Sequence, residues 1–152
     1  MILVTHAVVG GAIGQVIGNP SLAFSAGFLS HFILDAIPHW DYPLGAKIGA
    51  ALDVDMNISS KYFKHDIAKI TLDILIGFIF VYIFQLSFWA AAGAIFPDFL
   101  QFAYFKLRWR PLRWLQSFHI WIHSDLRLDS RPVFGPLLQI LLIIAVIAII
   151  SL

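Results

Sequence analysis

The sequence predicts an all-α protein that crosses a membrane about five times, as two repeated helical hairpins followed by a C-terminal helix. Of its 152 residues, 60% are hydrophobic and only 12% are charged, whereas soluble domains carry about 25% charged residues. Four long, nearly uncharged stretches, at 4–18, 21–34, 74–96 and 133–152, each approach the length of a membrane span. In addition, all ten basic residues fall on one side of the predicted arrangement.

The first predicted hairpin covers residues 1–37. Gly18, Asn19 and Pro20 interrupt its apolar sequence, and this combination is typical of a helix end followed by a turn. We therefore expect helices at 3–18 and 20–37. The N-terminus does not resemble a cleaved signal peptide, because it lacks a basic region and His6 interrupts its apolar run.

The second predicted hairpin covers residues 67–104, a run too long for one span. Its polar interruption, Gln85-Leu86-Ser87, predicts a turn between helices at 67–84 and 87–104. The last helix is expected at 133–152, after a segment that contains helix breakers. Residues 38–66 and 105–132 are predicted to be interfacial loops of a single domain, 1–152, and the stretch 111–125 reads as an amphipathic helix.

The positive charges predict the orientation of this arrangement. The basic residues are Lys47, Lys61, Lys64, Lys69, Lys106, Arg108, Arg110, Arg113, Arg127 and Arg131. Positively charged loops mark the cytoplasmic side of a membrane protein. We therefore expect a protein integral to the cytoplasmic membrane, with its N-terminus and polar site facing the cytoplasm and its C-terminus on the opposite side.

The most informative polar residues belong to the first hairpin. His31 and Asp35 are four residues apart, so they share one face of a helix. Counting from the turn places His6 at a height midway between them. Ionisable side chains inside apolar segments usually mark function, so these three are predicted to bind a metal ion.

A stripe of small residues on the first helix supports this placement. Gly10, Gly14 and Gly18 recur every four residues, a spacing that permits close approach of helices. Such an approach would bring His6 near the partner helices.

Four further acids and histidines are predicted to join the site. His39 and Asp41 follow the second helix and are assigned to catalysis, with Asp41 as a general base. Asp73 and Asp98 lie at equal distances from the second turn, at the same predicted height as the first set, and are predicted metal ligands. A carboxylate inside an apolar run needs a partner or a proton.

The segment before the last helix adds two histidines and a basic cluster. His119 and His123 are four residues apart, which on a helix is a recurrent spacing of zinc ligands. Arg108, Arg110 and Arg113 are interleaved with tryptophans and are predicted to bind the phosphate of a lipid headgroup.

Together these motifs resemble those of the membrane-bound metal-dependent hydrolase family, whose members are small multi-pass helical proteins. The matching positions are Thr5-His6, His31-x3-Asp35, Pro97-Asp98 and His119-x3-His123-Ser124. The helix with His31, Asp35 and nearby His39 is also similar, more loosely, to zinc-dependent phospholipase C. The chain departs from the hydrolase family in motif order, since its His-x3-Asp helix precedes Pro97-Asp98. Leu100 and Ile120 also replace the family's usual second acid and arginine.

We therefore expect a membrane-embedded, metal-dependent hydrolase that attacks a phosphoester of a lipid or another membrane-associated substrate through a metal-activated water. Because the chain lacks cysteine, histidine and carboxylate must bind the metal, which suits one or two Zn²⁺ ions, with manganese or iron as alternatives. The expected partners are the bilayer and anionic headgroups, not nucleic acid. Two other functions stay open, a non-catalytic metal-binding or ion-conducting protein and a structural membrane protein with paired polar groups.

Overall fold

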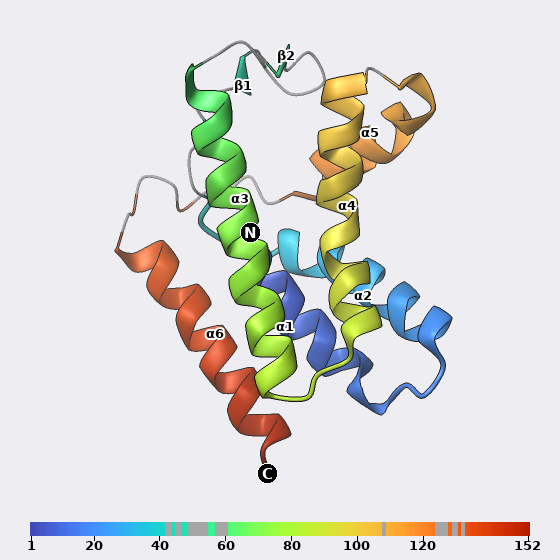
Figure 1. Cartoon of the computed structure of the whole chain (residues 1–152), viewed down its shortest axis with the longest axis vertical. Helices are drawn as coiled ribbons and strands as arrows, with labels where there is room; N and C mark the ends of the chain where they lie inside the picture. Colours follow the sequence, from blue (N-terminus) through green and yellow to red (C-terminus); the bar gives the residue numbers. More distant parts are fainter. Residues whose placement is uncertain are drawn as a thin grey trace.

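The computed structural model describes residues 1–41, 44, 47–48, 55–56, 61–107, 109–123, 128, 131 and 133–152. This part of the chain forms a bundle of α-helices with a small antiparallel sheet at one end (Figure 1). The helices are α1 (Leu3–Ile13), α2 (Pro20–Asp35), α3 (Lys61–Ile83), α4 (Phe88–Leu107), α5 (Arg113–Ile122) and α6 (Phe134–Ile150). Short 3-10 turns at Gly14–Val16 and Arg110–Leu112 follow α1 and precede α5. The strands β1 (Lys47–Ile48) and β2 (Asp55–Met56) pair Lys47 with Met56.

Local sequence explains both tight connections. Asn19 caps α2, since its side-chain oxygen accepts hydrogen bonds from the N–H groups of Ser21 (3.0 Å) and Leu22 (3.1 Å). Pro20 stands at the first helical position, where its missing N–H costs nothing. Between α3 and α4, Gln85 adopts a left-handed conformation with φ 52°, which reverses the chain direction at the predicted turn.

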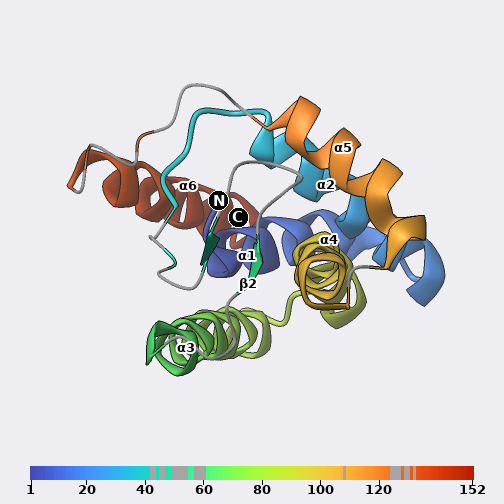
Figure 2. The ribbon, with the colours of Figure 1, turned by 90° about the horizontal axis from the view of Figure 1, so that it is seen from above.

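Helix α1 lies at the centre of the bundle. Viewed along the helices, it is surrounded by α2, α3, α4 and α6 (Figure 2). Its buried residues Leu3, Val4, Ala7 and Val8 form the main apolar core with side chains of α3, α4 and α6. The central place of α1 explains why His6, one turn into it, is fully buried.

Helices α2 and α4 touch backbone to backbone at two glycines. A Cβ atom on Gly27 would overlap the carbonyl of Ala90, and one on Gly93 would overlap the carbonyl of Phe24. Gly10 and Gly14 of the predicted stripe likewise face Ala94 and Ala90 of α4, whereas a Cβ atom on Gly18 would meet no atom of the described residues within 4 Å beyond its chain neighbours. These contacts bring the histidines of α1 and α2 against α4.

The predicted membrane topology is wrong. Among the described residues, no helix combines the length and the apolar character needed to cross a membrane. Helices α1, α2 and α6 have 11, 16 and 17 residues, so at 1.5 Å per residue they reach roughly 16–26 Å, short of the ~30 Å hydrocarbon layer. Helices α3 and α4 are longer but carry charged residues, among them Asp73 and Asp98. The five-span, multi-pass architecture and the localisation in the cytoplasmic membrane are corrected accordingly.

The reason for this error is visible on the outer faces of the helices. Large apolar side chains such as Ile79 on α3 and Ile144 on α6 are 54% and 56% exposed. Apolar residues therefore occupy both the buried and the exposed faces of these helices, and the sequence pattern alone does not separate one face from the other.

Candidate metal centre

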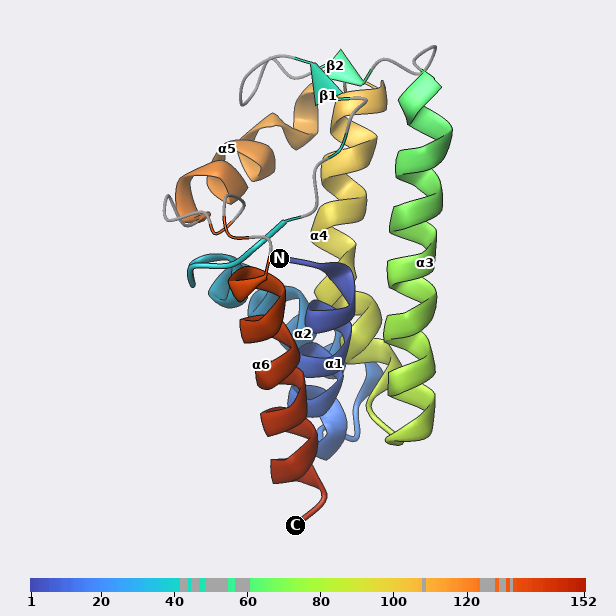
Figure 3. The same cartoon turned by 90° about the vertical axis from the view of Figure 1, so that its left-hand side faces the viewer.

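Four elements bring the acids and histidines together at mid-height in the bundle. Helix α5 contacts both α2 and α4, and its lower end in Figure 3 lies just above the end of α2, so His119 and the adjoining His123 reach the end of α2. The contributing residues are His6 of α1, His31 and Asp35 of α2, His39 and Asp41 just after α2, Asp98 of α4, and His119 and His123 at the end of α5. All of them except Asp41 belong to three overlapping groups of possible metal ligands, each with its ligand atoms within 4.8 Å of one another.

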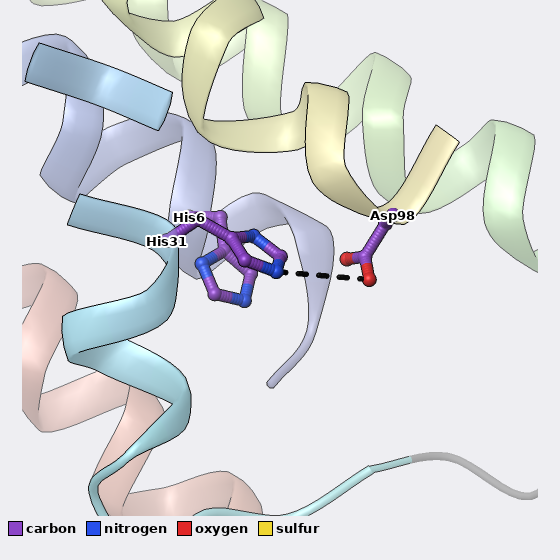
Figure 4. A group of neighbouring side chains, drawn as sticks. All are labelled: His6, His31 and Asp98. Carbon is purple, nitrogen blue, oxygen red and sulfur yellow. Dashed lines mark ion pairs between the residues drawn. The ribbon is translucent and has the colours of Figure 1, made fainter. Parts of the chain in front are cut away.

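The first group consists of His6, His31 and Asp98 (Figure 4). The two imidazole rings are stacked, with centroids 4.2 Å apart. Asp98 Oδ1 lies 3.9 Å from His31 Nε2. His6 Nε2 also lies 3.2 Å from Asp35 Oδ1. His6 thus lies next to both His31 and Asp35, which agrees with its predicted height midway between them.

We name the second group, His31, Asp35 and His119, the inner group. His119 Nε2 lies 2.9 Å from Asp35 Oδ2, and His31 Nε2 lies 3.2 Å from the same oxygen. The two Nε2 atoms are 3.3 Å apart. All three side chains are at most 4% exposed.

We name the third group, Asp35, His39 and His123, the outer group. Its histidine Nε2 atoms are 3.2 Å apart, and His39 Nε2 lies 3.8 Å from the other oxygen of Asp35, Oδ1. Asp41 adjoins this group, with Oδ2 3.4 Å from His39 Nε2 and 3.7 Å from His123 Nε2. The α-amino group of Met1 contacts both Asp35 (3.1 Å) and Asp41 (2.8 Å). The outer group is more open, because His123 and Asp41 are 17% and 36% exposed.

Backbone carbonyls orient two of the imidazole rings. His31 Nδ1 donates to the carbonyl oxygen of Ala94 (2.8 Å), and His39 Nδ1 donates to that of Ile37 (2.7 Å). A carbonyl only accepts, so in both rings Nδ1 carries the proton and Nε2 is the nitrogen directed at the site. Metal-binding histidines are oriented in this way, through a hydrogen bond from the second ring nitrogen.

The distances fit a tetrahedral metal ion. Nitrogens bound about 2.0–2.1 Å from a tetrahedral zinc lie about 3.3 Å from each other. The His31–His119 and His39–His123 pairs have Nε2 separations of 3.3 and 3.2 Å. Without a cation, a proton on His119 Nε2, donated to Asp35 Oδ2 at 2.9 Å, allows the inner pair to approach this closely. The donor set, imidazole and carboxylate without thiolate, also suits zinc.

His6 gives a second indication of a cation site. Neither of its ring nitrogens makes a hydrogen bond with the described residues, although the side chain is fully buried. Its Nε2 is near Asp35 Oδ1 but does not direct an N–H at it. An unsatisfied buried polar group costs about 1–3 kcal/mol, and a bound metal ion would remove that cost.

Burial and charge act in opposite directions on the ionisable groups. Burial, together with the neighbouring His31, lowers the pKa of His6 to about 4. Burial alone would also lower the pKa of His31, but the carboxylates of Asp98 and Asp35 outweigh it and raise that pKa. Burial alone would raise the pKa of Asp35, yet the histidines around it outweigh that effect and lower it. Asp35 is therefore ionised and available to a cation.

The pKa of His6 predicts how the metal-free protein responds to acid. In the unfolded chain His6 takes up a proton near pH 6.5, whereas in the folded protein it does so only at about pH 4. Between these values the unfolded state binds more protons, so the free energy of unfolding should fall by about 3 kcal/mol as the pH drops through the window, at about 1.4 kcal/mol per pKa unit. Because the pKa of His31 is raised instead, its effect on the free energy of unfolding falls mainly above this window.

Urea unfolding in the presence of EDTA, at several pH values between 7 and 4, measures this loss. The His6→Asn variant should lack the slope between about pH 6.5 and 5, whereas below about pH 5 the lowered pKa values of Asp35 and Asp41 give both proteins a further slope. A wild-type protein whose stability is flat in this window would contradict a neutral, buried His6.

Asp73 belongs to none of the three groups among the described residues. Its carboxylate accepts hydrogen bonds from the N–H groups of Leu3 (2.7 Å) and Val4 (3.1 Å) at the start of α1. A carboxylate at a helix N-terminus satisfies free N–H groups and complements the helix dipole. Asp73 therefore holds α1, and thereby His6, in place from the neighbouring helix, instead of facing the groups that could bind a metal.

The predicted histidine pair and arginine cluster are placed differently from expectation. Helix α5 ends at Ile122, and His123 has an extended backbone, with ψ 129°. His119 and His123 consequently point to different groups, the inner and the outer. Arg110 and Arg113 are exposed at the start of α5, and Arg108 lies outside the described residues.

Sequence reasoning missed one buried polar residue at the site, Gln139 of α6, which is 2% exposed. The signal for it was available, because Gln139 is the single polar side chain in the helix Phe134–Ile150.

Comparisons with models of protein families, with curated proteins and with solved structures found no match. The resemblance to the hydrolase family therefore stays a prediction that rests on the motifs alone.

Proposed function

We propose that this protein is a metal-dependent hydrolase that acts on a phosphoester. The observation that carries the proposal is the pair of histidine couples, each with a zinc-like separation of its Nε2 atoms, on either side of Asp35. Each oxygen of Asp35 faces a different couple. Asp35 could therefore serve as a shared ligand of two neighbouring metal ions, one at each couple.

Exposure divides the roles between the two groups. Catalytic zinc sites keep one open position, whereas structural sites are closed. The buried inner group suits a structural ion, and the partly exposed outer group suits the ion that receives substrate and water. When bound there, the ion would act as a Lewis acid and lower the pKa of a bound water.

The surrounding residues support substrate binding at the outer group. Burial alone would raise the pKa of the Asp41 carboxyl. The neighbouring His123 and His39 outweigh burial, so the pKa of Asp41 is lowered. Asp41 is thus a carboxylate at neutral pH, positioned to orient a water by accepting its hydrogen bond, although its lowered pKa makes it a weak acceptor of a proton. Arg110, in the turn before α5, and Arg113, its first residue, are exposed, and guanidinium pairs well with a phosphate.

Metal analysis and hydrolysis assays on the purified protein test the proposal. We expect up to two Zn²⁺ per chain, hydrolysis of bis(p-nitrophenyl) phosphate or p-nitrophenyl phosphate, loss of hydrolysis with 1,10-phenanthroline, and recovery when Zn²⁺ is added. His119→Ala should lower the rate more than about a hundredfold, because even outer-shell partners of a metal contribute 10–100-fold. His65→Ala is the matched control, since His65 is an exposed histidine of α3 outside the three groups.

Two results would contradict the proposal. Hydrolysis that survives complete removal of metal would exclude a metal-dependent reaction. Tight binding of two metal ions without hydrolysis of either substrate would favour the non-catalytic metal-binding protein, for which the closed inner group is already suited.

A further inference from the structure

Helix α6 supplies no member of the three ligand groups, yet one of its side chains bonds residues next to the site. Its sequence from Phe134 to Ile150 is apolar apart from Gln139. This side chain is 2% exposed and directed at α1 and at the segment that follows α2. A buried amide inside an apolar helix is costly unless each polar atom is bonded.

Both ends of the Gln139 amide are used. Its Oε1 accepts from the N–H of Ile2 (3.1 Å) and from the hydroxyl of Thr5 (3.2 Å). Its Nε2 donates to the carbonyl oxygen of Trp40 (2.7 Å). One side chain therefore links the N-terminal part of α1 to the segment after α2.

The positions that it links are neighbours of site residues. Thr5 precedes His6, and Trp40 stands between His39 and Asp41. One turn earlier on α6, Gly135 packs against Trp40 so closely that a Cβ atom there would overlap the Trp40 side chain. The segment after α2 also accepts a backbone hydrogen bond, from the N–H of Leu128 to the carbonyl oxygen of His39 (3.0 Å).

We propose that Gln139 is a positioning residue that fixes the outer group relative to α1. Without its amide, the segment that carries His39 and Asp41 loses a direct attachment to the bundle, while the inner group keeps its anchors on α2 and α5. Removing an outer-shell partner lowers metal affinity by about 10–100-fold. The inference rests on the proposed function, because it concerns the position of the same candidate ligands.

Zinc titration against a chromophoric chelator tests the inference with the full chain. The stage of binding that His123→Ala removes reports the outer group. In Gln139→Leu we expect the affinity of this stage to fall 10–100-fold, with the other stage unchanged. Ile140→Leu is the matched control, because Ile140 is 50% exposed on the same helix. Gln139→Met, with a side chain as long as glutamine, replaces Gln139→Leu if the latter does not fold.

The failures of the two proposals are distinguishable. If the wild type shows both stages and Gln139→Leu retains both affinities, the positioning role is excluded and the metal centre stands. If the wild type binds no zinc, the proposed function fails, and the imidazole ¹⁵N spectrum of the metal-free protein decides the positioning role. The ring signals of His39 and His123 should then move in Gln139→Leu but not in Ile140→Leu, with those of His31 unchanged. Signals of His39 and His123 that stay in place would overturn the inference.

Discussion

Asp35→Asn should remove both metal ions and lower phosphodiester hydrolysis more than about a hundredfold, the upper end of the loss caused by outer-shell changes. Asp35 is the one carboxylate common to the inner and outer groups, and its side chain is 2% exposed. Asparagine has the same size, so packing should be kept. It lacks the negative charge, however, and its NH₂ group would face imidazole nitrogens where a cation is expected.

Zinc content and the hydrolysis rate of the purified variant measure this effect. Asp66→Asn serves as the control, because Asp66 is also a buried aspartate but lies on α3, near Lys69. Its hydrolysis rate should remain within about twofold of wild type, a change below 0.5 kcal/mol. A variant Asp35→Asn that binds two zinc ions as tightly as wild type would remove Asp35 from the centre.

Gly27→Ala should destabilise the fold by about 3 kcal/mol or more, at the upper end of overpacking costs. The new methyl group would overlap the backbone carbonyl of Ala90 in α4, and a backbone atom cannot turn away as a side chain can. This effect outweighs the gain of about 1 kcal/mol that alanine brings to a helix. Separation of α2 from α4 would also break the bond from His31 to the Ala94 carbonyl.

Urea unfolding at pH 7 compares this variant with Gly18→Ala. A methyl group on Gly18 would meet no atom of the described residues within 4 Å, so this substitution should change stability by less than about 0.5 kcal/mol. Equal stabilities of the two variants would show that α2 and α4 are not in backbone contact at Gly27.

Helix positions and heights were accessible from the sequence because they depend on local rules. The turn at Asn19-Pro20 and the constant rise per residue placed His6 level with His31 and Asp35. The same counting put Asp73 at a comparable height but could not place it around the bundle. Its carboxylate lies on the α3 side of α1 and caps that helix.

The membrane prediction failed for a related reason. A high apolar content is compatible with exposed as well as buried apolar faces, and hydropathy does not report where a helix ends. Helix α1 ends at Ile13, several residues before the expected boundary. The four-residue spacing of His119 and His123 misled in the same way, because α5 ends between them.

The sequence by itself determined that the chain is helical, where its turns lie, and that His6, His31 and Asp35 share one level, since these features follow from propensities, helix breakers and the helical rise. Only the tertiary structure decided which side chains meet. Backbone contact at Gly27 and Gly93 sets the rotation of α2 against α4, and the crossing of α5 brings His119 to Asp35. Such contacts join residues more than 60 positions apart, so they depend on packing between helices, which no local pattern encodes.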